Sequence, residues 1–442
     1  MRFLSDIPTL RNLGIRFKAS TYWKDIAWLA SGTVVAQAVM LATMPVFSRI
    51  FTPADFAVQN LFGQIVGLVV VAATLRYEYF IQLPQQDEDA RLLVQLVAVL
   101  GFFTTTILTP VLWLFRDVIA RWAGDVALAP WLPFIPVTAA AMAVSVAVQG
   151  YTQRQRLFRR SGEAELAGKV GYAGTILAGW YFLPGAGGLV MGWLGASLGK
   201  IAWLLRGTLR VSCGGFVDLL RLGRAYSRMG GSLVLSHAFL SCTGVIPSVF
   251  IAHAYGSETL GQYALASLAI FLPSALLGGA IGSVYFQRAS ERWAQGLSFE
   301  DIWRSTAKKL LLIGLPLYAV AILTMPSVFP LVFGKVWRPA GYYGAILATS
   351  AFFAFVTTPM DRTCLVVGAW RYVLLWHVAR TVTTGMVVGM ALYFQWDMDI
   401  FMIIFVVQQI VLFLIDYWAE WRFAHFQPPH TSPAGGTLCV GP

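Results

Sequence analysis

The fold of this chain is decided by uncharged stretches such as residues 92–115, LLVQLVAVLGFFTTTILTPVLWLF, which recur along the sequence. A helix of about 20 apolar residues spans the ~30 Å hydrocarbon core of a lipid bilayer. Inside that core the backbone must satisfy its own hydrogen bonds, so each stretch is expected to be a helix. The sequence therefore predicts an all-α polytopic membrane protein.

Working outward from residues 92–115, we expect about twelve transmembrane helices. They are predicted at residues 26–47, 56–76, 92–115, 131–151, 167–183, 188–205, 230–253, 260–286, 310–333, 341–366, 372–394 and 400–421. Two halves of six spans begin on the same side, and Pro45 and Pro247 lie at similar places in their first spans, which indicates a parallel repeat. The predicted domains are a cytoplasmic amphipathic leader (1–25), two six-helix bundles (26–205 and 230–421), a cytoplasmic linker (206–229) and a disordered cytoplasmic tail (422–442).

The composition excludes most soluble functions. Hydrophobic residues make up 57% of the chain and charged residues 12%, whereas a soluble domain carries about 25% charged residues. No polar stretch is long enough for a soluble catalytic domain, and none of the four cysteines has metal-ligand spacing. We expect no enzyme activity and no catalytic or metal-binding residues. We also expect no nucleic-acid partner, because the net charge of +11 comes from the basic residues that set the orientation in the membrane.

The distribution of Lys and Arg predicts the orientation. Of the 32 basic residues, 26 fall in the leader, the tail and every second loop, and 5 fall in the opposite loops. Basic residues concentrate on the cytoplasmic side of membrane proteins, so we expect an inner (plasma) membrane protein with both termini cytoplasmic. The outer loops are short, the longest being residues 116–130, which argues against a membrane glycosyltransferase or polymerase.

A family resemblance follows from several short motifs. Residues 31–33 (SGT), 45–56 (PVFSRIFTPADF), 73–78 (ATLRYE), 83–84 (LP) and 261–266 (GQYALA) resemble those of Wzx-type oligosaccharide flippases. These are polysaccharide-biosynthesis proteins of the multidrug/oligosaccharidyl-lipid/polysaccharide (MOP) exporter superfamily. Ala57 departs mildly from the family, which often has Gly after the Phe of the second motif.

The resemblance implies two six-helix bundles around a central cavity that opens alternately to each side. It also implies a flippase moving a polyprenyl-diphosphate-linked oligosaccharide, such as an O-antigen, capsule or exopolysaccharide unit, from the inner to the outer leaflet. We expect no cofactor beyond a coupling ion, H⁺ or Na⁺. The expected partners are the lipid-linked oligosaccharide, membrane lipids, and a polysaccharide polymerase and glycosyltransferases. The alternative is a multidrug or cation exporter of the same superfamily, which calls for acidic residues deep in the first bundle.

Arg380 is the sharpest candidate for substrate binding. It lies well inside the span 372–394, where a charge costs at least about 2.5–3.5 kcal/mol and must face a cavity or a partner. An arginine fork pairs bidentately with phosphate oxygens, so Arg380 is predicted to contact the diphosphate. The alternative is a structural ion pair. His377 shares its helix face and is either a titrating group or a hydrogen-bonded one.

Two further arginines are candidate substrate contacts. Arg76 ends the span 56–76 beside Glu78, where a diphosphate would arrive from the inner leaflet. It is predicted to be a capture residue, with snorkelling or a pair with Glu78 as the alternatives. Arg49, at the opposite end of the first span, either helps to release the head group or simply faces water.

Three carboxylates are candidates for ion coupling or for structural ion pairs. They are Asp416 in the last span, Asp361 at the end of the span 341–366, and Glu78.

Overall fold

The computed structural model describes residues 19–208 and 215–426, which contain helices and loops and no strand. Twelve helices of 20 or more residues dominate these ranges. They are α1 (Ala19–Ile50), α2 (Pro53–Thr74), α3 (Asp87–Leu114), α5 (Ile135–Arg154), α6 (Phe158–Phe182), α7 (Gly187–Thr208), α8 (Phe216–Tyr255), α9 (Ser257–Ala294), α10 (Glu300–Phe333), α11 (Arg338–Thr357), α13 (Trp370–Phe394) and α14 (Met398–Ala424). The short elements are α4 (Arg116–Ala123), α12 (Thr363–Val366) and the 3₁₀ turns η1 (Tyr77–Phe80), η2 (Val126–Phe134), η3 (Lys335–Trp337) and η4 (Thr358–Met360).

The long helices correspond one to one to the twelve predicted spans. Within the described ranges, nine helical segments are long and apolar enough to cross a membrane, and α1 adds the shorter apolar segment Val35–Ile50. The helix α6 is less apolar because five charged side chains lie in its first half. The predicted fold class, an all-α polytopic membrane protein, is confirmed.

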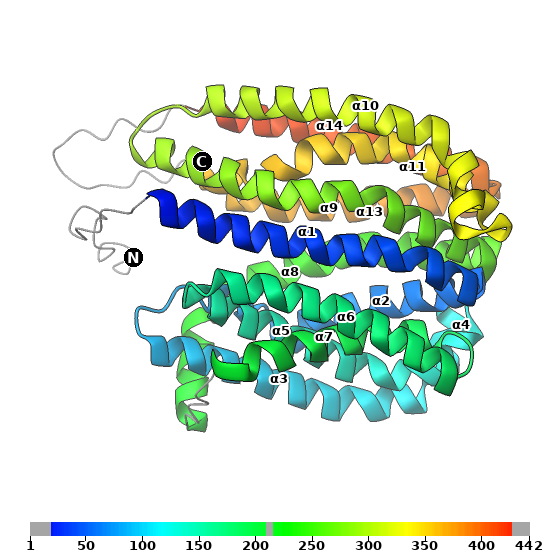
Figure 1. Cartoon of the computed structure of the whole chain (residues 1–442), viewed down its shortest axis with the longest axis horizontal. Helices are drawn as coiled ribbons and strands as arrows, with labels where there is room; N and C mark the ends of the chain where they lie inside the picture. Colours follow the sequence, from blue (N-terminus) through cyan, green and yellow to red (C-terminus); the bar gives the residue numbers. More distant parts are fainter. Residues whose placement is uncertain (1–18, 209–214, 427–442) are drawn as a thin grey trace.

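The helices form two bundles whose axes run along the long direction of the molecule (Figure 1). In the first bundle, α6 packs against α1 and α7, and α3 packs against α5. In the second, α11 packs against α9, α10 and α14, and α8 packs against α13. The helix α2 contacts α8 and α9 and joins the bundles. We call the end where α1 begins and α14 ends the terminal end, and the opposite end the distal end.

Glycines allow the closest helix crossings in the first bundle. A Cβ atom on Gly32 of α1 would lie 2.6 Å from the Cα atom of Gly162 of α6, and one on Gly171 of α6 would lie 2.5 Å from the carbonyl oxygen of Gly195 of α7. Helices in a bilayer associate through such small residues, because lipid offers no hydrophobic driving force between them. The wall formed by α1, α6 and α7 is therefore held by backbone contact.

The helix α8 extends beyond its predicted span at the terminal end. It begins at Phe216 and continues without a break to Tyr255, so a helix occupies much of residues 206–229, the segment predicted as a linker. Leu219 and Leu222 are buried in this extension, in the apolar cluster that also holds Tyr77 and Phe80 of the first bundle. The hydroxyl group of Tyr77 donates a hydrogen bond of 2.8 Å to the carbonyl oxygen of Gly223. Burial of this apolar face explains why the segment is helical.

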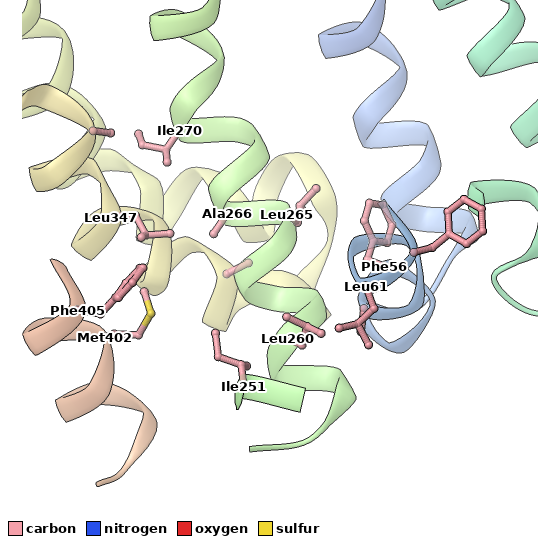
Figure 2. Packing of buried hydrophobic residues seen from close by; sticks show 14 of the residues in the cluster. Phe56, Leu61, Ile251, Leu260, Leu265, Ala266, Ile270, Leu347, Met402 and Phe405 are labelled. Carbon is pink, nitrogen blue, oxygen red and sulfur yellow. The ribbon is translucent and has the colours of Figure 1, made fainter. Parts of the chain in front are cut away.

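At the distal end the two bundles touch directly. A Cβ atom on Gly261 of α9 would lie 1.7 Å from the carbonyl oxygen of Pro53 of α2. The ring of Phe56 meets the edge of Trp337 at 5.0 Å between centroids, and the indole nitrogen of Trp337 donates a 2.8 Å hydrogen bond to the carbonyl oxygen of Ser48. In Figure 2, Leu61 of α2 faces the side of α9 that carries Leu260. The distal end is therefore closed by packing between the bundles.

Candidate functional site

A cavity of about 450 Å³ lies between the bundles. Its walls come from α1, α2, α6 and α7 of the first bundle and from α9 of the second. Its lining residues are Met40, Phe56, Gln59, Asn60, Gly63, Gln64, Lys169, Tyr172, Trp193, Ala196, Ala264, Ser267 and Leu268. Among the residues that the structure describes, Lys169 is the one charged residue of this lining, and no carboxylate belongs to it.

Lys169 carries a positive charge into the membrane interior. At 1.5 Å per residue it lies about 20 Å from the distal end of α6, well within a ~30 Å hydrocarbon layer. The polar contact that the structure gives its ammonium nitrogen is the sulfur atom of Met40, at 3.2 Å. A half-buried ammonium whose contact is a thioether sulfur is able to bind an anion.

The nearest carboxylate to Lys169 is engaged elsewhere. Glu165, one helical turn away, pairs with the ammonium of Lys200 at 2.7 Å and accepts a 2.9 Å hydrogen bond from the amide of Gln149. Lys169 interacts electrostatically with both Glu165 and Lys200. The three residues together carry one net positive charge, and Lys169 presents it to the cavity.

Aromatic rings and amides make up the polar part of the remaining wall. The amide of Gln59 donates to the hydroxyl oxygen of Tyr172 at 2.7 Å and to the carbonyl oxygen of Leu189 at 3.2 Å, which fixes the Tyr172 ring. The rings of Tyr172 and Trp193 meet edge to face at 6.3 Å. A Cβ atom on Gly63 would lie 3.2 Å from the Trp193 ring, so a glycine leaves room for the indole.

Buried polar atoms of this wall lack a hydrogen-bond partner. They include the amide oxygen of Asn60, an acceptor, and the indole nitrogen of Trp193, a donor. Unsatisfied buried polar atoms are uncommon in proteins, and both belong to residues that line the same cavity. Such a donor and acceptor suit a ligand that carries hydroxyl groups.

Arg380 lies in the second bundle, among carboxylates, and is not part of the cavity lining. Its guanidinium group interacts electrostatically with Asp361 and Asp416 and lies 5.5 Å from the ring centroid of Phe413. Carboxylate oxygens of Asp361, Asp416 and Glu420 all lie within 4.8 Å of one another, a spacing that could hold a cation. Asp416 also accepts a 2.6 Å hydrogen bond from Tyr372. The sequence predicts Arg380, Asp361 and Asp416 as separate candidate residues. In the structure they lie close together.

Arg76 and Glu78 form an ion pair of 3.1 Å at the terminal end of α2. The helix ends because Leu75 and Arg76 adopt left-handed backbone angles (φ 44° and 62°), which turn the chain sharply. The Arg76 guanidinium lies 5.7 Å from the ring centroid of Tyr79. The sequence left three roles open for Arg76: substrate capture, snorkelling and a pair with Glu78. The observed geometry is that of the pair with Glu78, and the capture role stays a prediction.

His377 and Arg49 each have protein partners. The Nδ1 atom of His377 lies 2.7 Å from the hydroxyl oxygen of Ser236, across the contact of α13 with α8. Arg49 is exposed at the distal end, where its guanidinium donates a 3.4 Å hydrogen bond to the carbonyl oxygen of Val332. These two residues lie far apart along the bundle, and their predicted contacts with substrate stay predictions.

Lys169 is the residue that sequence reasoning missed. It lies close to the beginning of the predicted span 167–183, where its charge groups with those of the preceding loop. The helix α6 begins earlier, at Phe158, and carries Glu165 and Lys169 into the bundle. The signal that could have found it is the spacing of Glu165 and Lys169, four residues apart, which places both on one helix face.

A family comparison and a structural comparison agree with this architecture. A family described as "Polysaccharide biosynthesis protein" matches residues 46–341, more than half of the chain. The chain therefore belongs to this family, and the predicted membership of the MOP superfamily is confirmed. No curated protein matches the sequence.

Solved transporter structures share the fold at low sequence identity. An inward-facing multidrug resistance MATE family transporter of the MOP superfamily has 17% identity and a TM-score of 0.66, with 90% of this chain and 94% of that chain covered. A MOP superfamily transporter from Pyrococcus furiosus, described by the reverse polarity of its binding pocket, has 17% identity, a TM-score of 0.61 and coverage of 91% and 96%. The Vibrio cholerae MATE transporter VcmN in its bent form has 15% identity, a TM-score of 0.56 and coverage of 91% and 98%.

Proposed function

We propose that this protein is a flippase that moves a polyprenyl-diphosphate-linked oligosaccharide from the inner to the outer leaflet of the inner membrane. The observation that carries the proposal is the chemistry of the central cavity, where Lys169 is the charged lining residue and carboxylates are missing from the lining. A diphosphate head cannot cross hydrocarbon unless a lined cavity replaces its hydration. An ammonium group in this position replaces part of that hydration with a charge-assisted contact.

The rest of the cavity wall suits the sugar part of such a substrate. The Asn60 amide oxygen can accept a hydrogen bond from a sugar hydroxyl, and the Trp193 indole nitrogen can donate one. The apolar faces of Tyr172 and Trp193 can lie against the C–H faces of a sugar ring. A site with one cation and several neutral polar groups is complementary to a substrate that has an anionic diphosphate at one end and a neutral glycan.

The main alternative, a multidrug or cation exporter, fits the cavity less well. A cationic substrate needs carboxylates in its path through the membrane, and the neighbouring carboxylate, Glu165, is paired with Lys200. Lys169 would also repel such a substrate.

The mechanism that we propose is alternating access coupled to H⁺ or Na⁺. The packed contact of Gly261 with Pro53 would close the cavity at the distal end in one state and separate in the other. Asp361 and Asp416, which lie with Glu420 beside Arg380, are the carboxylates that we propose for ion coupling. Glycosyltransferases would supply the substrate, and a polymerase would use the flipped product.

Replacement of Lys169 tests the proposal. The variant Lys169→Gln should slow the flipping of a polyprenyl-diphosphate oligosaccharide in proteoliposomes about tenfold, since a lost contact of about 1.4 kcal/mol gives that factor. Lys169→Arg should keep most of the activity because it keeps the charge. The measurement is the rate at which glycan becomes accessible outside the vesicles, with Lys308→Gln, an exposed charge outside the cavity, as the matched control.

Two results would contradict the proposal. One is flipping by Lys169→Gln at the rate of the unmodified protein. The other is export of a cationic dye by the unmodified protein, with no transport of the lipid-linked glycan.

A further inference from the structure

Two adjoining cavities lie between α9 and α10 at the terminal end, away from the central cavity. One is polar and measures about 480 Å³, and the other is mostly apolar and measures about 370 Å³. Four residues line both cavities, so the two form one continuous groove. They are Arg288 of α9 and Ile302, Thr306 and Lys309 of α10.

The charges of the polar cavity do not cancel. Arg292 pairs with Asp301 at 3.0 Å, and Glu291 accepts a 2.8 Å hydrogen bond from Gln287. Within the described part of the chain, the structure gives Arg288 and Lys309 no carboxylate at salt-bridge distance. Arg288 and Lys309 contribute two positive charges and Glu291 one negative charge, so this cavity carries one net positive charge.

The sequence places these two cations at the boundary of the membrane. Residues 259–287 of α9 and 310–333 of α10 contain no charged residue, and Arg288 and Lys309 are the charges that end these stretches at the terminal end. Each stretch is long enough to cross the ~30 Å hydrocarbon layer. Lys and Arg in such places lie among the lipid head groups.

The apolar cavity continues the groove toward the membrane interior. Ile281 and Val284 of α9 face Leu310 and Ile313 of α10 across it. Ile313 is 50% exposed, so the cavity borders the surface that faces the acyl chains. A cationic pocket directly joined to an apolar channel is complementary to a phospholipid. The cationic pocket would hold the phosphate, and the apolar channel would hold one acyl chain.

We propose that the groove between α9 and α10 binds a phospholipid that carries one net negative charge, such as phosphatidylglycerol, from the leaflet at the terminal end. The phosphate lies between Arg288 and Lys309, and one acyl chain lies along Val284, Leu310 and Ile313. A single phosphodiester balances the one net positive charge of the cavity, whereas a zwitterionic lipid leaves it unbalanced. The site holds the terminal ends of α9 and α10 together through the lipid.

Lipid retention by the purified full-length protein tests this proposal. Nanodiscs with equal amounts of phosphatidylglycerol and phosphatidylethanolamine are exchanged into detergent, and the retained lipids are counted by native mass spectrometry. We expect selective retention of phosphatidylglycerol, with a roughly tenfold weaker affinity in the double variant Arg288→Gln/Lys309→Gln. Val284→Trp should also reduce retention, because the larger ring fills the apolar part of the groove.

The matched control is Arg304→Gln/Lys308→Gln. It removes the same charge from exposed positions of α10 that line neither cavity, so it should retain phosphatidylglycerol as the unmodified protein does. Melting curves for all variants establish that they are folded.

Three outcomes overturn the proposal. The first is an equal loss of lipid in both double variants, which would indicate only a diffuse surface charge. The second is equal retention of phosphatidylethanolamine. The third is displacement of phosphatidylglycerol from this groove by a polyprenyl phosphate at lower concentration, which would make the groove a substrate site.

Discussion

At the scale of single residues, most charges that enter the bundles have an opposite charge nearby. Lys200 has Glu165, Arg76 has Glu78, and Arg380 has Asp361 and Asp416. Lys169 differs, because its neighbouring carboxylate, Glu165, is already paired with Lys200 and its ammonium contacts a thioether sulfur. A charge that lacks a close opposite partner costs free energy unless a ligand supplies one. This contrast is the reason that the proposed function depends on Lys169 and not on the more conspicuous Arg380.

The pair of Arg76 and Glu78 can be tested by a double-mutant cycle. We expect Arg76→Ala and Glu78→Ala each to lower the thermal stability of the purified protein, and the double variant to be no worse than either. The coupling energy should be on the order of 1–2 kcal/mol, as for contacting charged residues. Arg76 is a capture residue instead if Arg76→Ala leaves the thermal stability unchanged and a higher substrate concentration restores transport by this variant.

Arg380 is expected to act as a counter-ion for the carboxylates of the second bundle. Without it, three carboxylates lie within 4.8 Å of one another, so Arg380→Ala should reduce the amount of folded protein. Arg380→Lys should restore part of it, because an ammonium keeps the charge and loses the fork. Arg380→Ala/Asp416→Asn should also recover folded protein, measured by fluorescence size-exclusion chromatography. Normal protein levels with loss of glycan transport in Arg380→Ala would favour the predicted contact with substrate.

The sequence could identify Arg380 but not Lys169, for a physical reason. A charge deep inside a long apolar run is visible without a structure, because its cost in hydrocarbon follows from position alone. Lys169 lies near the edge of its apolar run, where snorkelling is the ordinary expectation. Only the earlier start of α6 at Phe158, and the packing of its glycines on α1 and α7, turn Lys169 toward the cavity.

At the scale of helices, the motifs that carried the family resemblance form the distal contact between the bundles. Thr52 caps α2 in a capping box with Asp55, Pro53 begins the helix, and Phe56 packs on Trp337. Gln262 of the motif 261–266 donates a 2.9 Å hydrogen bond to the carbonyl oxygen of Val336. The capping box is local, but the contacts of Phe56 and Gln262 could not be deduced from the sequence, because their partners lie more than 70 positions away along the chain.

Gly261 is expected to control how tightly the distal end closes. A methyl group on Gly261 would collide with the carbonyl oxygen of Pro53 at 1.7 Å, so Gly261→Ala should force α2 and α9 apart. Overpacking of this kind costs about 1–3 kcal/mol, which changes the ratio of closed to open states by about 5- to 150-fold. Spin labels on Asp55 and Lys335 should report a longer distance in Gly261→Ala.

The control for this prediction is Gly67→Ala, also a glycine on the helices that join the bundles, whose added methyl group meets nothing within 4 Å. An unchanged distance distribution in Gly261→Ala, equal to that of Gly67→Ala, would show that the distal contact is not a gate.

At the scale of the whole molecule, the number and class of helices could be predicted because they depend on the thickness of the bilayer. The lengths of α8, α9 and α10 could not, since their terminal ends continue past the membrane boundary and are held by packing on neighbouring elements. The resemblance implied a central cavity, but its lining residues were beyond the sequence, because they depend on how α1, α2, α6, α7 and α9 pack.

The predicted orientation of the molecule in the membrane depends on the distribution of charge alone. The terminal end carries most of the 32 Lys and Arg residues, and the distal loops carry Arg49, Arg116, Arg121, Lys335 and Arg338. Because basic residues are retained in the cytoplasm, reporter fusions at Ala186 and Met398, both at the distal end, should be active outside. A fusion at Gly223, in the extension of α8, should be active inside. The reversed pattern would place Arg288 and Lys309 in the outer leaflet and would reverse the direction of transport proposed here.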